Sequence, residues 1–306
     1  MKGPPPTNEQ VTRWLMLAEG SRWTRLRHRP FTYSFFQIYD KLVYPIVRRG
    51  LEVSCHTFFG QPMQVRIPAG AAIFLTGGLA HDSEKKLIRY LLQRFTENDV
   101  FVDVGAHFGF YSLLACRCIG TGNGISVLAL EPSESSFALL KKNLQAYPQA
   151  QAVQALAGDR ERLCTFLEFD ERFSEYNSAH AGRYQGQDWI KRVRQQRREL
   201  PCLPLHQLCA AYGIVPSIIK IDVEGMEPEV IEGAAPLLQR PCEVIMEYFS
   251  DPAIQEPYRR AERWLREAGY CSYLITASGT LQPVADVGLA VSSSGLDSDN
   301  VVFRNH

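Results

Sequence analysis

The sequence has little that would carry the protein into a membrane or onto nucleic acid. Its apolar runs stay well short of the ~18–20 residues that span a bilayer, and Met1 to Pro6 do not begin the apolar core of a signal peptide. The 33 basic and 33 acidic residues cancel, so no overall field attracts nucleic acid. We therefore expect neither a transmembrane segment nor a nucleic-acid partner.

The eight cysteines form neither a metal-ligand pattern nor a disulfide framework. Cys116 and Cys118 are two positions apart on a predicted helix, where their side chains do not face each other. The others are scattered, mostly within apolar segments. This favours reduced, buried cysteines in a cytoplasmic enzyme, and we predict no bound metal. A chain of 306 residues that is 45% apolar and 22% charged fits one large domain, or a domain with an extension.

The rest of the sequence is organised around a short apolar strand and the glycine loop after it. Residues 100–104 are typical of a strand buried on both faces, and residues 111–116 begin a predicted helix. Between them, Gly105 and Gly109 let the backbone approach a ligand, and the helix N-terminus offers free N–H groups. The Gly-x-Gly-x-x-Gly pattern of dinucleotide sites is missing, which weakens a reading as an NAD-dependent oxidoreductase. The acidic Asp103 fits a ligand with a cationic amino-acid end.

A second strand is predicted over residues 125–131, and it ends in Glu131. A carboxylate at the end of the second strand of such a unit typically accepts hydrogen bonds from both hydroxyls of a ribose. Alone, Glu131 would be interpreted as a solvent-facing acid. Its place after this glycine loop, and before Pro132 and Ser133, favours the ribose role.

Three stretches resemble the FkbM family of S-adenosylmethionine-dependent methyltransferases. They are FVDVGAHFGFYS at 101–112, LALEPSESSFALLKKNL at 128–144 and IIKIDVEGMEPEVIEGA at 218–234. The resemblance covers roughly Leu75 to Gly269, and its most specific piece is Lys-Ile-Asp-Val-Glu-Gly at 220–225. One departure is His107, because the family commonly carries Asn at that place in the loop.

The resemblance implies the Rossmann-like α/β fold of class I methyltransferases, with a mostly parallel seven-stranded sheet and helices on both faces. The third to fifth strands are expected over residues 151–157, 217–222 and 242–246. We divide the chain into an N-terminal helical extension with a β-hairpin at 1–74, and an S-adenosylmethionine-binding methyltransferase domain at 75–306.

The cofactor implied by the resemblance is S-adenosyl-L-methionine, and a set of residues is expected to bind it. They are Asp103, Gly105, Ala106, His107 and Gly109 at the methionine end, Glu131, Pro132 and Ser133 at the ribose, Asp159 beside the adenine, and Asp222. Asp159 could also be a simple turn residue. His81 and Glu84 could contact the cofactor or gate the pocket, or their segment could only cap the next helix through Asp82 or Ser83.

Methyl transfer to a hydroxyl needs alignment, exclusion of water and a base for the proton. We expect Asp222 and Glu224 near the reaction centre, as catalytic residues whose individual roles stay open. His81, His206 and Glu247 are further candidates for the base. Asp222, Glu224 and Glu247 could in principle bind Mg²⁺, although no ligand pattern supports a metal-dependent mechanism.

The resemblance favours O-methylation of a hydroxyl on a sugar, glycan or secondary metabolite. An N-methyltransferase of the same fold is an alternative, as is a non-catalytic binding or scaffold protein that retains the fold. The acceptor is expected to be a small molecule or glycan, and a homodimer is possible.

Two segments outside the motifs carry excess positive charge. The first fifty residues hold nine Lys or Arg against three Asp or Glu, with interleaved aromatic residues, and predict two or three short helices broken at Pro30 and Pro45. This extension could be a substrate cap, a dimer contact or a patch for an anionic surface, or it could simply pack on the domain. A second basic run at 191–198 is predicted on a helix, and could be a solvated face or contact an anionic substrate. Residues 51–75 predict a β-hairpin.

Overall fold

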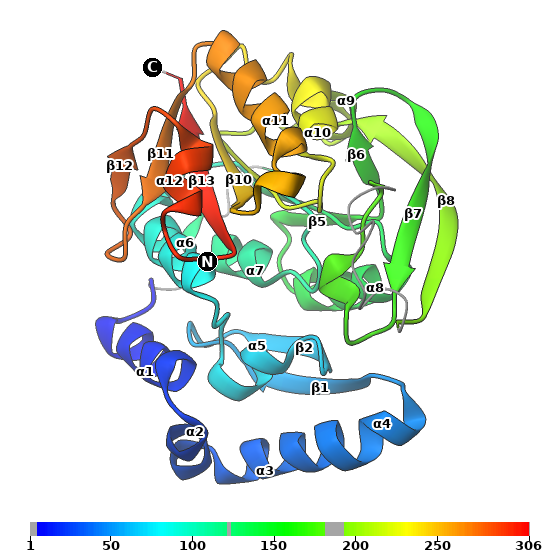
Figure 1. Cartoon of the computed structure of the whole chain (residues 1–306), viewed down its shortest axis with the longest axis vertical. Coiled ribbons are helices and arrows are strands. Elements are labelled where there is room, and N and C mark those ends of the chain that lie inside the picture. Colours follow the sequence, from blue (N-terminus) through cyan, green and yellow to red (C-terminus); the bar gives the residue numbers. More distant parts are fainter. Residues whose placement is uncertain (1–4, 121–123, 181–192, 306) are drawn as a thin grey trace.

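The computed structural model describes residues 5–120, 124–180 and 193–305. In these residues, a large twisted sheet of eight strands forms the centre of the molecule (Figure 1). Across the sheet the strands are β12 (Leu281–Pro283), β11 (Cys271–Ile275), β13 (Ser298–Arg304), β10 (Glu243–Phe249), β9 (Ile218–Ile221), β3 (Phe101–Val104), β4 (Val127–Leu130) and β5 (Ala150–Val153).

The strands from β10 to β5 are parallel, whereas β13 runs antiparallel between β10 and β11. The predicted mostly parallel α/β sheet is therefore confirmed. The described sheet has one strand more than the seven expected, because the three-residue strand β12 pairs with β11 at the edge.

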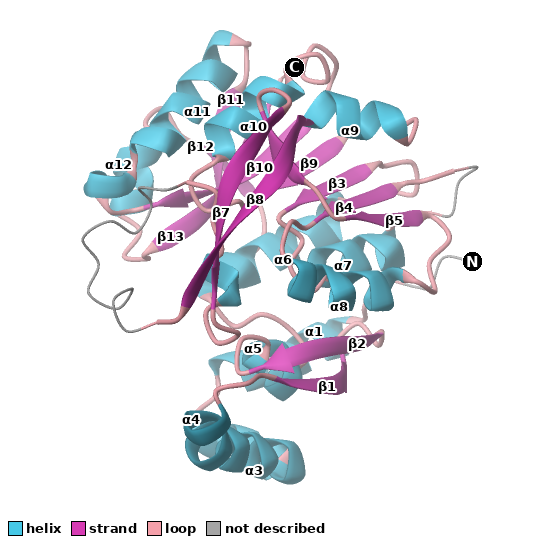
Figure 2. Ribbon diagram, turned by 90° about the vertical axis from the view of Figure 1, so that its right-hand side faces the viewer, coloured by secondary structure: helices cyan, strands magenta, loops and turns pink. Residues whose placement is uncertain are grey.

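Helices cover both faces of this sheet (Figure 2). One face packs on α6 (Asp82–Arg94), α7 (Phe110–Cys118) and α8 (Glu134–Leu144). The other packs on α9 (Leu205–Ala211), α10 (Glu227–Ala234), α11 (Glu256–Glu267) and α12 (Val287–Ser292).

Successive strand residues enter the two cores alternately. Phe101 and Ile218 belong to the α6–α8 side, while Val102 and Ile219 belong to the α9–α12 side. Because both faces are buried, the central strands have continuous apolar sequences rather than alternating ones.

A smaller sheet lies beside the large one, in the order β6 (Leu156–Gly158), β8 (Gln195–Pro204) and β7 (Arg162–Phe169). Two expectations were wrong here. Residues 151–157 do not form one strand, because the chain leaves β5 and enters β6 of the other sheet. The basic run is not a helix where it is described: residues 195–198 lie in β8, opposite β7. Residues 191 and 192 lie outside the described residues.

The N-terminal segment forms a separate layer at one end of the molecule (Figure 1). Its helices are α1 (Asn8–Glu19), α2 (Arg22–His28), α3 (Pro30–Ile38), the π-helical turn η1 (Tyr39–Val43) and α4 (Tyr44–Val47). Pro30 begins α3, where a missing N–H costs nothing, whereas Pro45 is accommodated inside the helix that η1 and α4 continue.

The predicted hairpin is confirmed as β1 (Leu51–His56) paired with β2 (Pro62–Ile67), and α5 (Ala71–Thr76) follows it. The division of the chain at residue 74 stays a prediction, and the structure places that residue inside α5. None of the described helices is long and apolar enough to cross a bilayer.

Candidate functional site at the carboxyl ends of the central strands

A cavity of about 500 Å³ opens where β3, β4, β9 and β10 end. Open parallel sheets generally bind ligands at this edge. Among the described residues, the lining contains seven carboxylates and a single lysine, Lys220. The carboxylates are Glu84, Glu131, Glu175, Asp222, Glu224, Glu247 and Asp297. A lining with so many acidic side chains favours a ligand that carries positive charge.

The glycine loop between β3 and α7 is pressed against the end of β9. Gly105 has a φ of +82°, and a Cβ at this position would lie 1.8 Å from the carbonyl oxygen of Asp222. The backbone N–H groups of Gly105 and Ala106 both donate to the carbonyl of Leu130, at 3.0 and 2.9 Å. Only glycine can hold this conformation so close to neighbouring backbone, so the loop joins the ends of three strands.

His107 lies at the tip of this loop with a φ of +50°. This left-handed region is one in which Asn, Asp and His are enriched, which explains how His can stand where the family commonly has Asn. The ring stacks on Phe108 with centroids 3.7 Å apart, and Nε2 lies 3.0 Å from Ser174 Oγ. Burial lowers the pKa of His107 to about 4, so the imidazole is neutral at physiological pH.

Glu131 is fixed by the backbone on both sides. Its Oε2 accepts from His107 N–H at 2.8 Å, and its Oε1 accepts from Ser133 N–H at 2.9 Å. Burial nevertheless raises the pKa of Glu131 to about 7, against the effect of these two bonds. The carboxylate lines the cavity and can accept further hydrogen bonds there.

Lys220 is a buried cation held between carboxylates. Its Nζ lies 3.1 Å from Asp222 Oδ2 and 3.8 Å from Asp103 Oδ1, and 5.1 Å from the ring centre of Tyr111. Burial works to lower the pKa of Lys220, but Asp222, Asp103 and Glu84 outweigh it and raise the pKa above its usual value. The ammonium therefore stays charged and orients Asp222.

Asp103 lies behind this lysine rather than in the cavity wall. Its Oδ2 accepts from Ser112 Oγ at 2.7 Å, and burial raises the pKa of the carboxyl group. The side chain is 1% exposed. Asp103 helps to hold the charged Lys220, which in turn contacts Asp222 in the cavity wall.

Glu84 enters the cavity from the start of α6. It accepts a hydrogen bond from Tyr111 Oη and another from Asn300 Nδ2, the latter at 3.2 Å. Burial raises the pKa of Glu84. The capping alternative for this segment is wrong, because the N-cap residue of α6 is His81 and no side chain of the described residues caps it.

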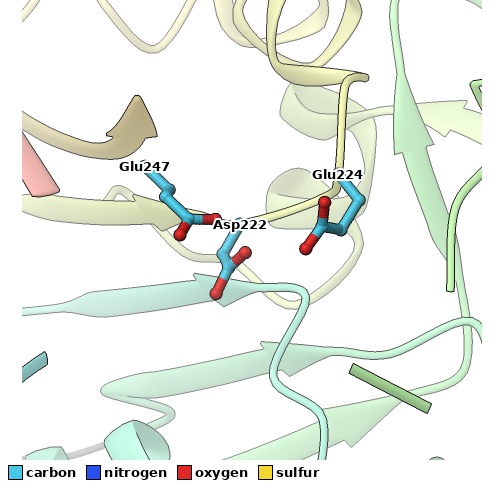
Figure 3. A group of neighbouring side chains, drawn as sticks. All are labelled: Asp222, Glu224 and Glu247. Carbon is cyan, nitrogen blue, oxygen red and sulfur yellow. The ribbon is translucent and has the colours of Figure 1, made fainter. Parts of the chain in front are cut away.

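Three carboxylates from the ends of β9 and β10 face one another (Figure 3). The closest oxygens of Asp222, Glu224 and Glu247 lie within 4.8 Å of each other. Burial raises the pKa of Glu247 well above its usual value, and the charges of Asp222 and Glu224 add to this. These three side chains could hold a cation, as the sequence allowed, but the ammonium of Lys220 already contacts Asp222.

The turn that carries Asp222 and Glu224 is held by a fourth acid, Glu227. Its two oxygens accept from the N–H groups of Val223 and Gly225, at 3.3 and 2.9 Å. Glu224 itself has a φ of +54°. The hydrogen bonds to Glu227 hold Glu224 in this backbone conformation, which is unfavourable for a residue other than glycine.

The structure brings most of the predicted site residues together. The cavity lining includes His81, Glu84, Gly105, Ala106, His107, Glu131, Pro132, Asp222 and Glu224. The lining does not include Asp103, Gly109, Ser133 or Asp159. Asp159 pairs instead with Arg162 at 3.1 Å. A cofactor-binding role for these four residues stays a prediction.

The expected site residues did not include Lys220, Tyr111 or residues 174–176, all of which line the cavity. Lys220 and Tyr111 lay within the quoted motifs, and a charge at the end of a buried strand was the signal for Lys220. Residues 174–176, which form η2 (Ser174–Tyr176), carry no periodic pattern that would have placed them here.

The chain was compared with known proteins. The profile of the methyltransferase FkbM domain matches residues 103–271. A curated relative, the hexuronic acid methyltransferase AglP of Haloferax volcanii, is 28% identical over 173 residues, which are 54% of this chain and 62% of that protein. The match thus spans less than two thirds of the relative's length.

Solved structures that resemble this chain at low sequence identity include methyltransferases. Methyltransferase FkbM from Methylobacillus flagellatus is 13% identical, covers 69% of this chain and 44% of its own, and has a TM-score of 0.43. An O-methyltransferase from Bacillus cereus in complex with SAH is also 13% identical, with coverages of 89% and 96% and a TM-score of 0.41. Because the domain profile matches more than half of the 306 residues, the chain belongs to the FkbM methyltransferase family.

Proposed function

We propose that the protein is an S-adenosylmethionine-dependent methyltransferase that methylates a hydroxyl group of a sugar or glycan. The observation that carries the proposal is the acidic cavity beside Gly105, in which Glu131 is oriented by two backbone N–H groups. Family membership supports the reaction class.

The residues of the cavity fit S-adenosylmethionine. A carboxylate fixed like Glu131 can accept from both hydroxyls of a ribose. The surrounding carboxylates favour a ligand that carries a sulfonium and an ammonium group. The volume of about 500 Å³ suits a ligand of this size together with part of an acceptor. When bound, the sulfonium supplies an activated methyl group.

The protein's own contribution is to align the acceptor and remove its proton. We assign the reaction centre to Asp222 and Glu224, which lie beside each other on the turn that Glu227 stabilises. Lys220 holds Asp222 at 3.1 Å and keeps it oriented. One of the two carboxylates accepts the hydroxyl proton, while the neutral His107 ties the tip of the glycine loop to Ser174.

The sugar acceptor is supported by the relative from Haloferax volcanii, whose name describes methylation of a hexuronic acid. Methylation of a nitrogen acceptor is the second candidate within the same fold. A nitrogen acceptor needs a neutral amine rather than an ionised hydroxyl, so it makes weaker demands on a base.

The proposal is tested by transfer of a labelled methyl group from S-adenosylmethionine to uronic acids, neutral sugars and amino sugars. We expect labelled product with a hydroxyl acceptor. Replacing the base, by Asp222→Asn or Glu224→Gln, should lower kcat by about 10²–10⁴-fold, and Glu224→Gln should do so with little change in cofactor affinity. Transfer only to amines would overturn the O-methylation proposal, and binding without transfer to any acceptor would favour a scaffold protein.

A further inference from the structure

A continuous helix at the end of the molecule presents an apolar outer face. The helix consists of α3, η1 and α4, spans residues 30–47 and is about 27 Å long at 1.5 Å per residue. Its inner side buries Phe36, Tyr39 and Tyr44 against the protein. We define its apolar face as the exposed residues Phe31, Phe35, Ile38, Leu42, Val43, Ile46 and Val47.

The side chains of this apolar face are largely exposed to solvent. Phe31 is 88% exposed and Ile46 is 83% exposed, at opposite ends of the helix. Trp23 of α2 adds another large exposed side chain, at 67%. Soluble monomers rarely leave a contiguous apolar surface of this kind uncovered, and such surfaces usually mark an interaction site.

The charges of residues 22–49 that have no ion-pair partner among the described residues all have one sign. Five exposed cations belong to the same segment, and none takes part in an ion pair within the described part of the chain: Arg22, Arg27, Lys41, Arg48 and Arg49. The one acid between residues 20 and 50 is Asp40, which Arg172 neutralises at 2.6 Å. Beyond residue 50 the balance reverses, with 24 Lys or Arg against 30 Asp or Glu.

We propose that this helix lies on the surface of a bilayer that contains anionic phospholipids. An amphipathic helix with large apolar side chains on one side and flanking Arg, Lys and Trp residues matches the two layers of such a surface. The apolar side chains enter the acyl boundary, and the cations meet the headgroup phosphates.

The same charges disfavour a second copy of the chain as the occupant. In a two-fold symmetric dimer each surface meets itself, so this arrangement would bring two sets of unpaired cations together around the apolar contact. An anionic surface instead supplies the missing negative charge. The excess of acid in the rest of the chain would also turn the remainder of the molecule away from the lipid.

The proposed surface is connected to the cavity through a single helix. Phe35 contacts Phe74 of α5 edge to face, with ring centres 6.2 Å apart. Ala72 and Ile73 of the same α5 line the cavity. A bilayer under α3 and α4 would therefore lie one helix away from the proposed reaction site.

The test is co-sedimentation of the full-length protein with vesicles of phosphatidylcholine alone, and of phosphatidylcholine with about a third phosphatidylglycerol. We expect binding to the anionic vesicles that weakens as salt is raised. The variant Ile38→Glu/Leu42→Glu should lower the vesicle partition coefficient by at least about tenfold, because two large apolar side chains no longer leave water. Arg48→Gln/Arg49→Gln should reduce both the partition and its dependence on salt.

The matched control is Leu163→Glu/Leu289→Glu, which changes two comparably exposed leucines on β7 and α12. This control should bind vesicles like the wild type, and thermal unfolding should show that all variants are folded. The proposal is overturned if the wild type does not bind anionic vesicles, or if helix and control variants bind equally. It is also overturned if sedimentation velocity shows a dimer that Ile38→Glu/Leu42→Glu dissociates and that does not bind vesicles.

Discussion

At the scale of single residues, the site depends on a buried lysine among acids. Lys220 is opposite Asp103 in the parallel register of β3 and β9, and it also contacts Asp222. The side chain of Lys220 is 3% exposed, so its removal leaves carboxylates without their buried partner.

We predict that Lys220→Met lowers the free energy of unfolding by about 3 kcal/mol, the lower end for a broken buried pair because Asp222 keeps part of its hydration. Urea unfolding would measure this. Lys142→Met is the control, since the pair of Lys142 with Glu52 is exposed and should be worth under about 1 kcal/mol. Equal effects of the two substitutions would mean that Lys220 is not a structural cation.

The proton on Glu131 gives the second prediction at this scale. Burial raises the pKa of Glu131 to about 7, so the carboxyl group is mostly protonated at pH 6 and mostly ionised at pH 8. The ionised form accepts hydrogen bonds from both ribose hydroxyls, whereas the protonated form must give up its proton first. Affinity for S-adenosylhomocysteine should therefore rise about tenfold from pH 6 to pH 8.

Calorimetric titrations at several pH values would measure this rise. In Glu131→Gln the carboxylate is absent, so the affinity should be weak and should not increase over the same range. An increase of equal size in this variant would assign the proton to another group in the cavity.

At the scale of elements, the glycine loop and the end of β9 fit together only without a side chain at position 105. We predict that Gly105→Ala lowers the free energy of unfolding by more than about 3 kcal/mol and abolishes cofactor binding, because its Cβ would overlap the carbonyl of Asp222. Gly269→Ala is the matched control. Gly269 has a nearly equal φ of +86° but no atom within 4 Å of its Cβ position, so it should cost only about 1–2 kcal/mol.

Thermal and urea unfolding of both glycine variants would separate the two contributions. The cost in Gly269→Ala reports the backbone conformation alone. The additional cost in Gly105→Ala reports the close approach of the loop to β9. Equal losses of stability in the two variants would contradict the close contact between the glycine loop and the end of β9.

One side chain of α8 joins the N-terminal hairpin to this loop. Asn143 accepts from Gln64 N–H at 2.7 Å and donates to the carbonyls of Gln64 and Phe108, at 2.9 and 2.8 Å. We predict that Asn143→Ala costs about 3 kcal/mol, because buried backbone groups lose their partners. Hydrogen exchange should become faster in β2, whereas the exposed neighbour Gln145→Ala should leave both quantities nearly unchanged. Unchanged exchange in β2 would contradict this link.

Elements were predictable where apolar periodicity was strong. The strands β3, β4 and β9 follow from continuous apolar runs. Residues 151–157 were wrongly predicted to form one strand, because an apolar run does not reveal which sheet it joins. The helix predicted for the basic run was wrong for a related reason. A block of charged residues has no apolar periodicity that would tell a helix from a strand. In the structure, Arg197 and Arg198 lie opposite Leu167 and Phe166 in an exposed strand.

At the scale of the whole molecule, the family resemblance implied a mostly parallel sheet with helices on both faces, and the structure supplied the order of its strands. The order of residues along the chain did not show which side chains would become neighbours in the site. Lys220 and Asp103 are 117 positions apart and become neighbours only through strand register. Residues 174–176 reach the cavity from the smaller sheet without a motif, and the apolar face of the N-terminal helix became visible only once its buried side was known.

The proposed function requires the cavity to bind S-adenosylmethionine through Glu131. The most direct measurement is calorimetric titration of the protein with S-adenosylmethionine, S-adenosylhomocysteine and NAD, beside Glu131→Gln. We expect both sulfur ligands to bind the wild type, the variant to bind them much more weakly, and NAD not to bind. A folded wild-type protein that binds neither sulfur ligand, or that binds NAD instead, would contradict the proposed function.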